Sequence, residues 1–558
     1  MLRLTELRLP LDHDEAALRA ALLARLGVAT AALRSWTLFR RGYDARKKVA
    51  ISFVYTVDCE VDDEAAVLAA HAGDPHVRPS PDMRYRLVVA SPVAGTGRPR
   101  PVVVGFGPCG LFTALVLAQM GLRPLVLERG KAVRERTRDT WGLWRQGVLD
   151  PESNVQFGEG GAGTFSDGKL WSQISDPRHL TRKVLDEFVE AGAPDEILFV
   201  AKPHIGTFRL VGVVEKMRAE IERLGGEIRF GTRLVDLRIE DGAVRGVTVE
   251  KRRGDVTSKA GAREEIDAEH VVLALGHSAR DTFEMLHARG VAMEAKPFSI
   301  GFRIEHPQGL VDRARFGPSA GHPLLGAADY RIVHHAKNGR SVYSFCMCPG
   351  GTVVAATSEP GHVVTNGMSQ YSRNERNANA GIVVGITPDD YRRAGSTGTV
   401  DALDGIAFQR AWESRAFALG GGAYAAPGQR VGDFLAGRAS TAFGEVLPSY
   451  TPAVTPTDLA DPGNESLPGY AIEAIREALP AFERQIARFA MADAVLTGVE
   501  TRTSAPLRLP RGRDGQSISV RGLFPAGEGA GYAGGIMSAG VDGIETAEAV
   551  ARAIVTRT

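Results

Sequence analysis

Residues 2–90 alternate between two hydrophobic periods. Stretches in which every second residue is apolar and stretches with apolar residues three or four apart follow one another in the order βαββαβ. The predicted elements lie at residues 2–11, 14–28, 35–45, 48–61, 62–72 and 83–90. This order is typical of a ferredoxin-like α+β domain, which we place at residues 1–95.

A basic cluster falls in the central hairpin of this domain. We interpret it as a solvated edge, and a docking site for a protein partner or a nucleic acid is the minority alternative. The cluster comprises Arg40, Arg41, Arg46, Lys47 and Lys48.

The pattern changes twice after residue 100. Strand and helix patterns alternate up to about residue 286, which predicts a mostly parallel sheet covered by helices. Short β-like runs follow, and the chain then returns to a helix, a strand, a glycine-rich turn and a last helix. We predict an α/β fold with a Rossmann-type domain in two parts, at 96–294 and 496–558, and an inserted β-rich substrate or cap domain at 295–495. The Pro- and Gly-rich residues 91–101 are the predicted linker.

Composition narrows the function. Lys and Arg number 67 against 66 Asp and Glu, so no net field attracts polyanions and we expect no nucleic-acid partner. Four cysteines without metal-ligand spacing predict neither a disulfide scaffold nor a metal site, and they favour a reducing cytoplasm. The acidic start of the chain is unlike a signal peptide. Residues 101–122 are uncharged, but Pro108 and several glycines favour a strand, turn and helix over a membrane span.

The strand at 101–104 leads into a G-x-G-x-x-G turn. Gly105 permits the tight turn, Gly107 admits a pyrophosphate to the backbone, and Gly110 brings helix and strand together. The N-terminus of the following helix favours phosphate binding. Glu128 ends the next strand, 18 residues beyond Gly110, where a carboxylate accepts ribose hydroxyls. This predicts dinucleotide binding, and a purely structural βαβ unit is the alternative.

A second glycine-rich turn lies in the last fifty residues. A short strand leads into Gly527 and Glu528, and Gly535 and Ile536 open another helix. An extended FAD molecule can be held by segments about four hundred residues apart, whereas a simple nicotinamide dehydrogenase completes its fold earlier. The pair of turns therefore predicts one non-covalently bound FAD.

Long motifs resemble a known family, the mostly uncharacterised FAD-dependent dehydrogenases of bacteria and plastids within the glutathione-reductase-type superfamily. The motifs are GFGPCGLFTALVLAQMGLRPLVLERG, VQFGEGGAGTFSDGKL, VVLALGHSARDTFEML, KPFSIGFRIEHPQ, YSFCMCPGGTVVAATSEPG, VVTNGMSQYSRNERNANAG, GVETRTSAPLRL and GEGAGYAGGIMSAGVDGI. The resemblance covers nearly the whole chain.

The resemblance implies further cofactor contacts. The loop 158–169 would run past the pyrophosphate, residues 234 and 235 would offer backbone hydrogen bonds to adenine, and residue 276 would pack against the adenosine half. A flexible surface loop is the minority alternative for this glycine-rich segment. With the two turns, the expected cofactor-binding set is Gly105, Gly107, Pro108, Cys109, Gly110, Glu128, Arg129, Gly161, Gly163, Thr164, Asp167, Leu234, Val235, Gly276, Gly527, Glu528, Gly535 and Ile536.

Candidates for chemistry at the flavin ring are Lys169, Arg303, His306, Cys346 and Cys348. Each has a structural alternative, because strand histidines and arginines are usually satisfied structural groups and buried cysteines behave as small hydrophobes. In a regular strand the two cysteines would face the same side, with Cα atoms about 6.6 Å apart, at the long end for a disulfide. This spacing disfavours a catalytic dithiol.

These observations predict an FAD-dependent oxidoreductase that transfers hydride or electrons between FAD and a small organic substrate, with NADH or NADPH as a candidate transient donor. A flavin monooxygenase shares this architecture. A flavin-carrying redox sensor that binds a partner through its N-terminal domain is the alternative from outside the enzymes.

Overall fold

The computed structural model describes residues 1–89, 99–252, 261–393 and 398–556 of a mixed α/β chain. The predicted linker at 91–101 lies mostly outside these residues, and so does the predicted boundary at residue 95. None of the helices in the described part of the chain is long and apolar enough to cross a membrane.

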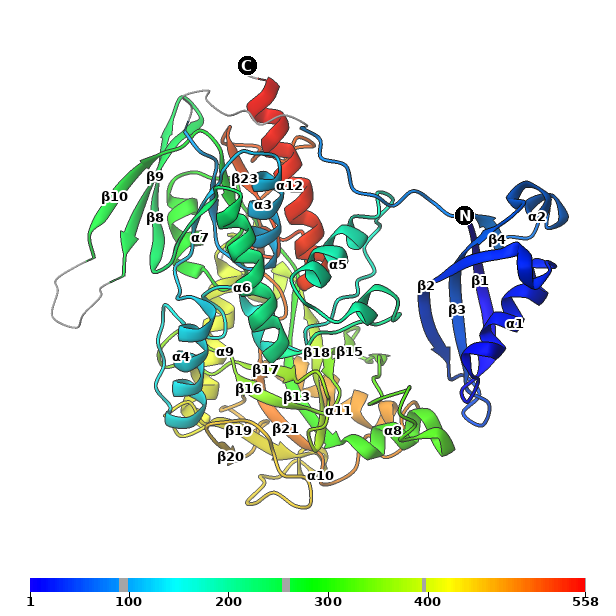
Figure 1. Ribbon diagram of the computed structural model, residues 1–558. Coiled ribbons are helices and arrows are strands. Elements are labelled where there is room, and N and C mark those ends of the chain that lie inside the picture. Colours follow the sequence, from blue (N-terminus) through cyan, green and yellow to red (C-terminus); the bar gives the residue numbers. More distant parts are fainter. Residues whose placement is uncertain (90–98, 253–260, 394–397, 557–558) are drawn as a thin grey trace.

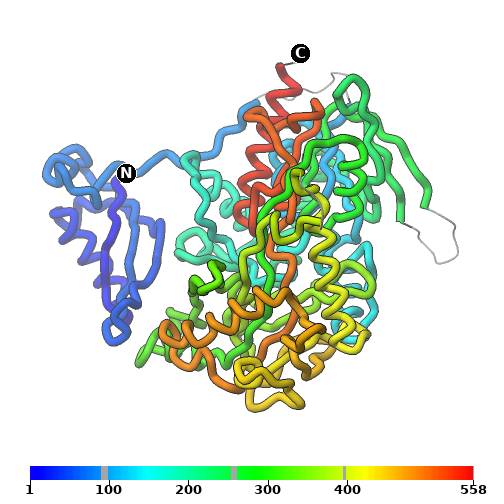
Figure 2. The backbone as a smooth tube through the Cα atoms, turned by 180° about the vertical axis from the view of Figure 1, so that it is seen from behind, coloured from blue at the N-terminus to red at the C-terminus, as the bar shows by residue number. Residues whose placement is uncertain are grey.

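The N-terminal residues form a unit that stands to one side of the main body in both backbone views (Figures 1 and 2). Its four strands pair antiparallel in the order β2-β3-β1-β4. The elements are β1 (Leu2–Pro10), α1 (Glu15–Leu26), β2 (Leu33–Asp44), β3 (Ser52–Val61), α2 (Glu64–Ala70) and β4 (Val77–Pro79).

Helix α1 shows how local sequence sets these elements. The Asp14 side chain caps its first turn, and Gly27 ends it in the left-handed conformation at φ 68°. Leu18, Leu22 and Leu26, four residues apart, are its buried stripe. The helix therefore packs one apolar face onto the sheet and exposes the other.

The predicted strand at 83–90 is wrong for its described residues. β4 already occupies the edge beside β1, directly after α2. Tyr85, Val88 and Val89 instead pack against the core around the C-terminal helix, and the Tyr85 hydroxyl donates to Glu548 at 3.1 Å. The apolar residues of this segment therefore pack against the main body, and they do not form a strand of the N-terminal sheet.

A parallel five-stranded sheet, in the order β23-β11-β5-β6-β7, forms the centre of the main body. Alternate residues face opposite layers. Val103 and Val272 point into a core shared with the helices, whereas Val102 and Val271 point into a core shared with a three-stranded antiparallel sheet. The elements of this unit are β5 (Val102–Val104), α3 (Pro108–Gln119), β6 (Leu125–Leu127), α4 (Val133–Gln146), α5 (Leu180–Glu190), α6 (Thr207–Arg223), β7 (Glu227–Arg229), β8 (Thr232–Glu240), β9 (Ala243–Lys251), β10 (Arg263–Asp267), β11 (Val271–Leu273), α7 (Arg280–Ala288), β23 (Leu523–Pro525) and α12 (Ile536–Thr556).

The middle of the chain builds a seven-stranded sheet in the order β14-β15-β18-β13-β21-β19-β20. It begins with β13 and ends with β21, which extends to Glu500, five residues beyond the predicted domain limit at 495. The elements are β12 (Glu294–Ala295), β13 (Phe298–Pro307), α8 (Gln308–Phe316), β14 (Val333–His335), β15 (Ser341–Cys348), β16 (Gly351–Ala355), β17 (Thr365–Ser369), β18 (Asn377–Ile386), α9 (Asp404–Leu419), β19 (Ala426–Arg430), α10 (Val431–Ala436), β20 (Val454–Pro456), α11 (Gly469–Glu483), β21 (Val495–Glu500) and β22 (Leu507–Arg508).

The N-terminal unit touches the main body through the basic hairpin. The Arg41 amide donates to the carbonyl oxygen of Phe199 at 2.6 Å, and the Arg41 carbonyl accepts from the amide of Ala201 at 2.9 Å. Part of the predicted solvated edge is therefore an internal contact.

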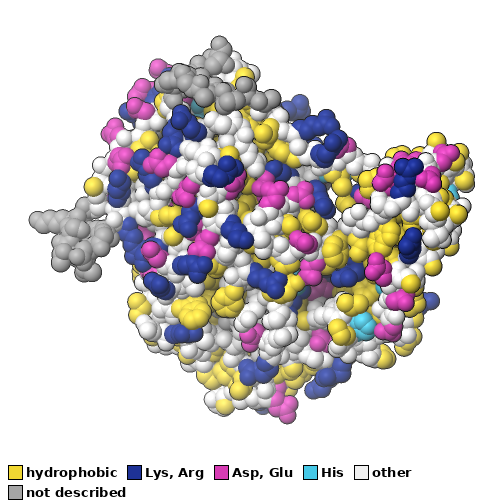
Figure 3. All heavy atoms as spheres, viewed as in Figure 1, with side chains coloured by type: hydrophobic (Ala, Val, Ile, Leu, Met, Phe, Trp, Pro, Cys, Tyr) yellow, Lys and Arg dark blue, Asp and Glu magenta, His cyan; other side chains and the backbone are white. Residues whose placement is uncertain are grey.

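On the face of the molecule shown in Figure 3, basic and acidic side chains are interspersed.

Candidate functional site

The first glycine-rich turn joins β5 to α3 through backbone contacts that leave no room for side chains. An added Cβ at Gly110 would lie 1.9 Å from the carbonyl oxygen of Gly105. One at Gly105, where φ is 97°, would lie 2.3 Å from the carbonyl oxygen of Ala274. Gly107 caps α3 without a side chain, and Pro108 begins it, so the first amides of the helix stay available to an anion.

The loop 158–169 lies between this turn and the start of α12. An added Cβ at Gly161 would lie 2.8 Å from the Cα atom of Gly107. One at Gly163 would lie 2.9 Å from Cγ1 of Ile536. The loop thus bridges the two ends of the predicted cofactor site.

A buried arginine that the sequence analysis missed holds this loop. The Arg136 guanidinium donates to the carbonyl oxygens of Asn154, Val155, Glu159 and Gly161 at 2.7 to 2.9 Å. Burial lowers the pKa of Arg136 to about 10. The available signal was helical spacing, because residue 136 lies on the same face of α4 as the buried residues 133, 140 and 143.

The second glycine-rich turn packs directly on the first. An added Cβ at Gly527 would lie 2.9 Å from the Cβ atom of Cys109. The Gly527 amide donates to the Asp542 carboxylate at 2.6 Å, and Asp542 also accepts from Arg511 at 3.2 Å. Segments more than four hundred residues apart in sequence therefore meet at one point.

One cavity of about 800 Å³ joins both turns and the loop. The sequence-predicted residues on its wall are Gly105, Gly107, Pro108, Cys109, Glu128, Arg129, Gly161, Gly163, Asp167, Lys169, Leu234, Gly276, Cys346, Gly527, Glu528, Gly535 and Ile536. Those not on its wall are Gly110, Thr164, Val235, Arg303, His306 and Cys348.

Glu128 has structural partners that the motif does not reveal. Its carboxylate accepts from the amides of Phe106 at 2.8 Å, Gly130 at 2.8 Å and Gly158 at 2.9 Å. A carboxylate has about four acceptor positions, so capacity remains for one further donor. Glu128 therefore ties the first turn to the glycine-rich loop while still lining the cavity.

At the same end of the cavity, the β8 backbone differs from a regular strand. Pairing with β9 shifts between Leu234 and Asp236, so Val235 stands outside the regular ladder while Leu234 lines the cavity. Arg129 lies over the ring of Phe157 at 4.0 Å and pairs with Glu152 at 2.9 Å. These contacts fix the wall on both sides of Glu128.

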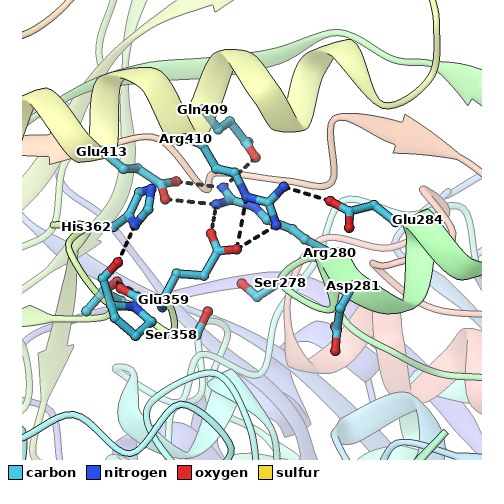
Figure 4. A network of polar contacts seen from close by, with 12 residues as sticks. Ser278, Arg280, Asp281, Glu284, Ser358, Glu359, His362, Gln409, Arg410 and Glu413 are labelled. Atoms are coloured by element: carbon cyan, nitrogen blue, oxygen red, sulfur yellow. Dashed lines mark hydrogen bonds and ion pairs between the residues drawn. The ribbon is translucent and has the colours of Figure 1, made fainter. Parts of the chain in front are cut away.

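Buried charges connect α7 and α9 behind the cavity (Figure 4). The Glu413 carboxylate accepts from Arg280 at 2.7 and 2.9 Å and from Arg502 at 2.8 and 3.0 Å. Burial raises the pKa of Glu413, but the two guanidinium groups outweigh it and hold this pKa well below its usual range. Arg502 also donates to Ser278 at 3.1 Å and lines the cavity, so the network positions part of its wall.

Glu528, on the cavity wall, is an acid with a perturbed pKa. Burial raises its pKa to about 7, and the charge of Lys296 only partly opposes this. The carboxyl group is therefore held close to its protonation midpoint at neutral pH, at the end where α12 begins.

Two ring-side candidates do not reach the cavity. His306 is fully buried and bonds through Nε2 to the carbonyl oxygen of Phe489 at 2.7 Å, and burial lowers its pKa to about 4. Arg303 is also fully buried and pairs with Glu500, a cavity residue whose pKa burial raises to about 7. Apolar and polar residues alternate along residues 298–305, but the β13 residues 298–306 are all buried, so this alternation does not separate wall from core.

Lys169 and Cys346 do lie on the cavity wall. The Lys169 ammonium donates to the carbonyl oxygen of Met347 and lies 3.8 Å from the Asp167 carboxylate. The regular extended strand expected around Cys346 and Cys348 is wrong, because pairing with β18 shifts between Phe345 and Cys348 and Cys346 has a φ of 42°. Neither Cys346 nor Cys348 forms a disulfide in this structure.

Comparison with known proteins gives the family. Residues 297–503 match the family model described as FAD-dependent protein, C-terminal domain-like, and residues 1–60 match a domain of unknown function, DUF8436. A protein of Clostridium beijerinckii, described as uncharacterized, is 46% identical over 554 residues, which cover 98% of each chain. The chain belongs to the same family as this protein of Clostridium beijerinckii. In this chain the matched segment 297–503 spans nearly the same residues as the seven-stranded sheet, from β13 to β21.

Solved structures resemble the chain only distantly. A geranylgeranyl bacteriochlorophyll reductase-like protein of Thermoplasma acidophilum is 12% identical over 82% of this chain and 79% of its own, with a TM-score of 0.35. The 3-ketosteroid-delta4-(5alpha)-dehydrogenase of Rhodococcus jostii is 13% identical over 84% of this chain and all of its own, with a TM-score of 0.33. No functional inference is taken from either.

Among the described residues, no group of three or more His, Cys, Asp or Glu side chains could hold a metal ion.

Replacing Glu413 tests the buried charge network. E413Q removes the buried carboxylate that Arg280 and Arg502 share and leaves them only Glu359, which also pairs with Arg410, so we expect it to destabilise the protein by roughly 3 kcal/mol. Urea unfolding measures the change. The matched control is E284Q, which removes an acid that pairs with Arg410 but is 49% exposed. We expect this variant to lower the free energy of unfolding by less than about 1 kcal/mol. Equal effects of the two variants would contradict the network's structural role.

Glu528 predicts a pH dependence of stability. Its folded pKa of about 7 lies above the ordinary 4.5, so the folded chain binds this proton more tightly than the unfolded chain. The unfolding free energy therefore falls as pH rises through this interval, by at most about 3 kcal/mol at roughly 1.4 kcal/mol per pH unit.

Urea unfolding of flavin-free protein at pH 5 and pH 8 should show a smaller loss for E528Q than for the unmodified chain. E240Q, which alters an acid that is 60% exposed at the end of β8, should lose as much as the unmodified chain. An E528Q chain with the full pH-dependent loss would exclude Glu528 as its source.

Proposed function

We propose that this protein is an FAD-dependent oxidoreductase that transfers hydride or electrons between a small organic substrate and one non-covalently bound FAD. The observation that carries the proposal is the direct packing of the Gly527 turn on the Cys109 turn, with a cavity of about 800 Å³ across both. The match of residues 297–503 to the family model of an FAD-dependent protein supports the same cofactor.

The described residues fit FAD at both of its ends. The uncapped start of α3, with Gly107 at its head, suits the pyrophosphate, and the remaining acceptor position of Glu128 suits a ribose hydroxyl. The start of α12 behind Gly535 suits the electron-rich end of the ring system. When bound, FAD accepts or donates hydride or electrons at its isoalloxazine ring.

The wall contributed by the seven-stranded sheet is the proposed substrate side. Tyr343, Cys346 and Glu500 belong to β15 and β21 of that sheet and line the same cavity as Lys169. We assign residues 295–495 to substrate binding and residues 1–95 to a ferredoxin-like domain that docks a protein partner. The proposal places the enzyme in the cytoplasm, with NADH or NADPH as the donor.

Anaerobic spectral titration of the purified protein tests the proposal. We expect a yellow protein whose flavin absorbance bleaches with dithionite and with NADH or NADPH. A colourless protein that cannot be reconstituted with FAD would overturn it. Rapid NAD(P)H-driven oxygen consumption with substrate hydroxylation would indicate a monooxygenase, and slow reduction without turnover would indicate a redox sensor.

The variant G107D tests where the pyrophosphate lies. An added Cβ at Gly107 would lie 3.5 Å from the Cα atom of Gly161, an ordinary contact, so a small side chain is tolerated by the fold. A carboxylate about 4 Å from a phosphate is repelled by roughly 4 kcal/mol at an effective dielectric constant near 20, so we expect FAD affinity to fall about a thousandfold.

FAD affinity is measured by fluorescence titration, and the thermal midpoint of the apoprotein reports folding. G107A is the control and should retain most of the affinity. A fully yellow G107D protein would contradict this placement.

A further inference from the structure

Cys346 and Cys348 lie where the pairing of β15 with β18 is interrupted. The partners pass from Phe345 and Gly381 to Cys348 and Asn379, and Cys346 has a left-handed backbone with φ 42°. The Cys348 thiol, at 3.3 Å, and the Arg303 guanidinium, at 2.8 Å, both donate to the carbonyl oxygen of Cys346. The bulge therefore fixes the two cysteines against each other and against a buried cation.

The two thiols differ in their access to the cavity. Cys346 lies on the wall, whereas Cys348 is fully buried behind it. An added Cβ at Gly367 would lie 2.9 Å from the Cys348 sulfur, and one at Gly351 would lie 3.3 Å from its Cβ. A solute in the cavity thus meets the outer sulfur while the inner one is screened.

The surroundings favour a thiolate at the outer position. Hydrogen bonding with the Cys348 thiol lowers the pKa of Cys346 well below its usual range, burial opposes this, and the charges of Lys169 and Arg303 add to the lowering. The same hydrogen bond and burial raise the pKa of Cys348. One reactive sulfur and one protonated partner are the two components of a thiol–disulfide couple.

We propose that Cys346 and Cys348 form a redox-active dithiol that exchanges two electrons with the FAD of the same cavity. The inference deepens the proposed function and rests on it. Cys346 shares the cavity wall with both glycine turns and with the start of α12, so its sulfur opens onto the space assigned to the cofactor.

The exchange balances without a further reactant. In the oxidising direction the Cys348 S–H bond breaks, an S–S bond forms between the two sulfurs, and two electrons pass to oxidised FAD. The Cys348 proton accompanies them, and because Cys346 starts as the thiolate the product is the anionic FADH⁻. In the reverse direction the S–S bond breaks, the two sulfurs take up the same two electrons, and Cys348 regains the proton while Cys346 returns to the thiolate. Lys169 stabilises the Cys346 thiolate in either direction.

Electron counting on the holoprotein tests the couple. The protein is fully reduced anaerobically and then titrated with ferricyanide while flavin absorbance is followed. The unmodified chain should release twice as many electrons per flavin as C346S or C348S. C348A repeats the measurement with a different side chain, and bound flavin absorbance shows that each variant is folded. C59A is the control, because Cys59 is buried in the N-terminal sheet, and it should match the unmodified chain.

A second readout does not depend on turnover. Reduced and oxidised holoprotein are denatured, alkylated with iodoacetamide and digested. In the oxidised sample the peptide with both cysteines should resist alkylation and weigh less by two hydrogen atoms, whereas Cys59 and Cys109 should be alkylated in both samples.

The outcomes separate the two proposals. A protein that binds FAD but keeps both thiols alkylatable after oxidation overturns the inference and leaves the proposed function standing. Equal electron counts for the unmodified chain and C348S do the same. Alkylation protection caused by a substrate adduct on Cys346 alone also overturns it. A protein that binds no FAD overturns both.

Discussion

Close contact between bare backbones at two remote turns is the constraint on which the site depends. Gly527 rests against Cys109, and an added Cβ at Gly543 would lie 2.4 Å from the carbonyl oxygen of Cys109. The Thr113 hydroxyl also donates to the carbonyl oxygen of Gly543 at 3.1 Å. These contacts let α3 and α12 approach without intervening side chains, so both helices direct their N-termini at one cavity. Any larger residue at the crossing would separate the two halves of the site.

Buried charge then sets how the seven-stranded sheet faces that cavity. Arg303 with Glu500 and Glu413 with Arg280 and Arg502 are ion pairs among nearly fully buried residues. Such pairs seldom add stability over apolar packing, but removing one partner leaves a buried charge uncompensated and is strongly destabilising. An arrangement of the sheet that separated these pairs would therefore be unfavourable. We infer that they fix orientation more than they stabilise the fold. The cavity wall also holds two acids, Glu500 and Glu528, and burial raises the pKa of each to about 7.

Local motifs were predictable from the sequence because their physical requirements are local. Gly110 is demanded by the turn itself, because an added Cβ would lie 1.9 Å from the carbonyl oxygen of Gly105, and Gly105 has a φ of 97° that favours glycine. The order of strands and helices before residue 79 follows hydrophobic period in the same way. The family resemblance supplied the loop 158–169, which spacing alone leaves ambiguous.

The rest depended on tertiary contacts. Arg303 and His306 were placed at the ring, yet every residue of β13 from 298 to 306 is buried, so the alternation of apolar and polar residues does not mark which face meets the cavity. Arg136 was not among the predicted site residues, because its partners are backbone carbonyl oxygens of a loop about 20 residues further along the chain. The bulge that brings Cys346 and Cys348 together needs a buried guanidinium from another strand, which no spacing of cysteines reveals.

The segment that leaves the N-terminal unit has a consequence for how the chain divides. Tyr85, Val88 and Val89 belong by sequence to the first unit, but they lie on the core of the second and are tied to α12 through Glu548. These residues contact the core around α12, and the N-terminal end of α12 lines the cavity. A main-body fragment that begins at residue 96 would therefore lack apolar cover around α12 as well as the small domain.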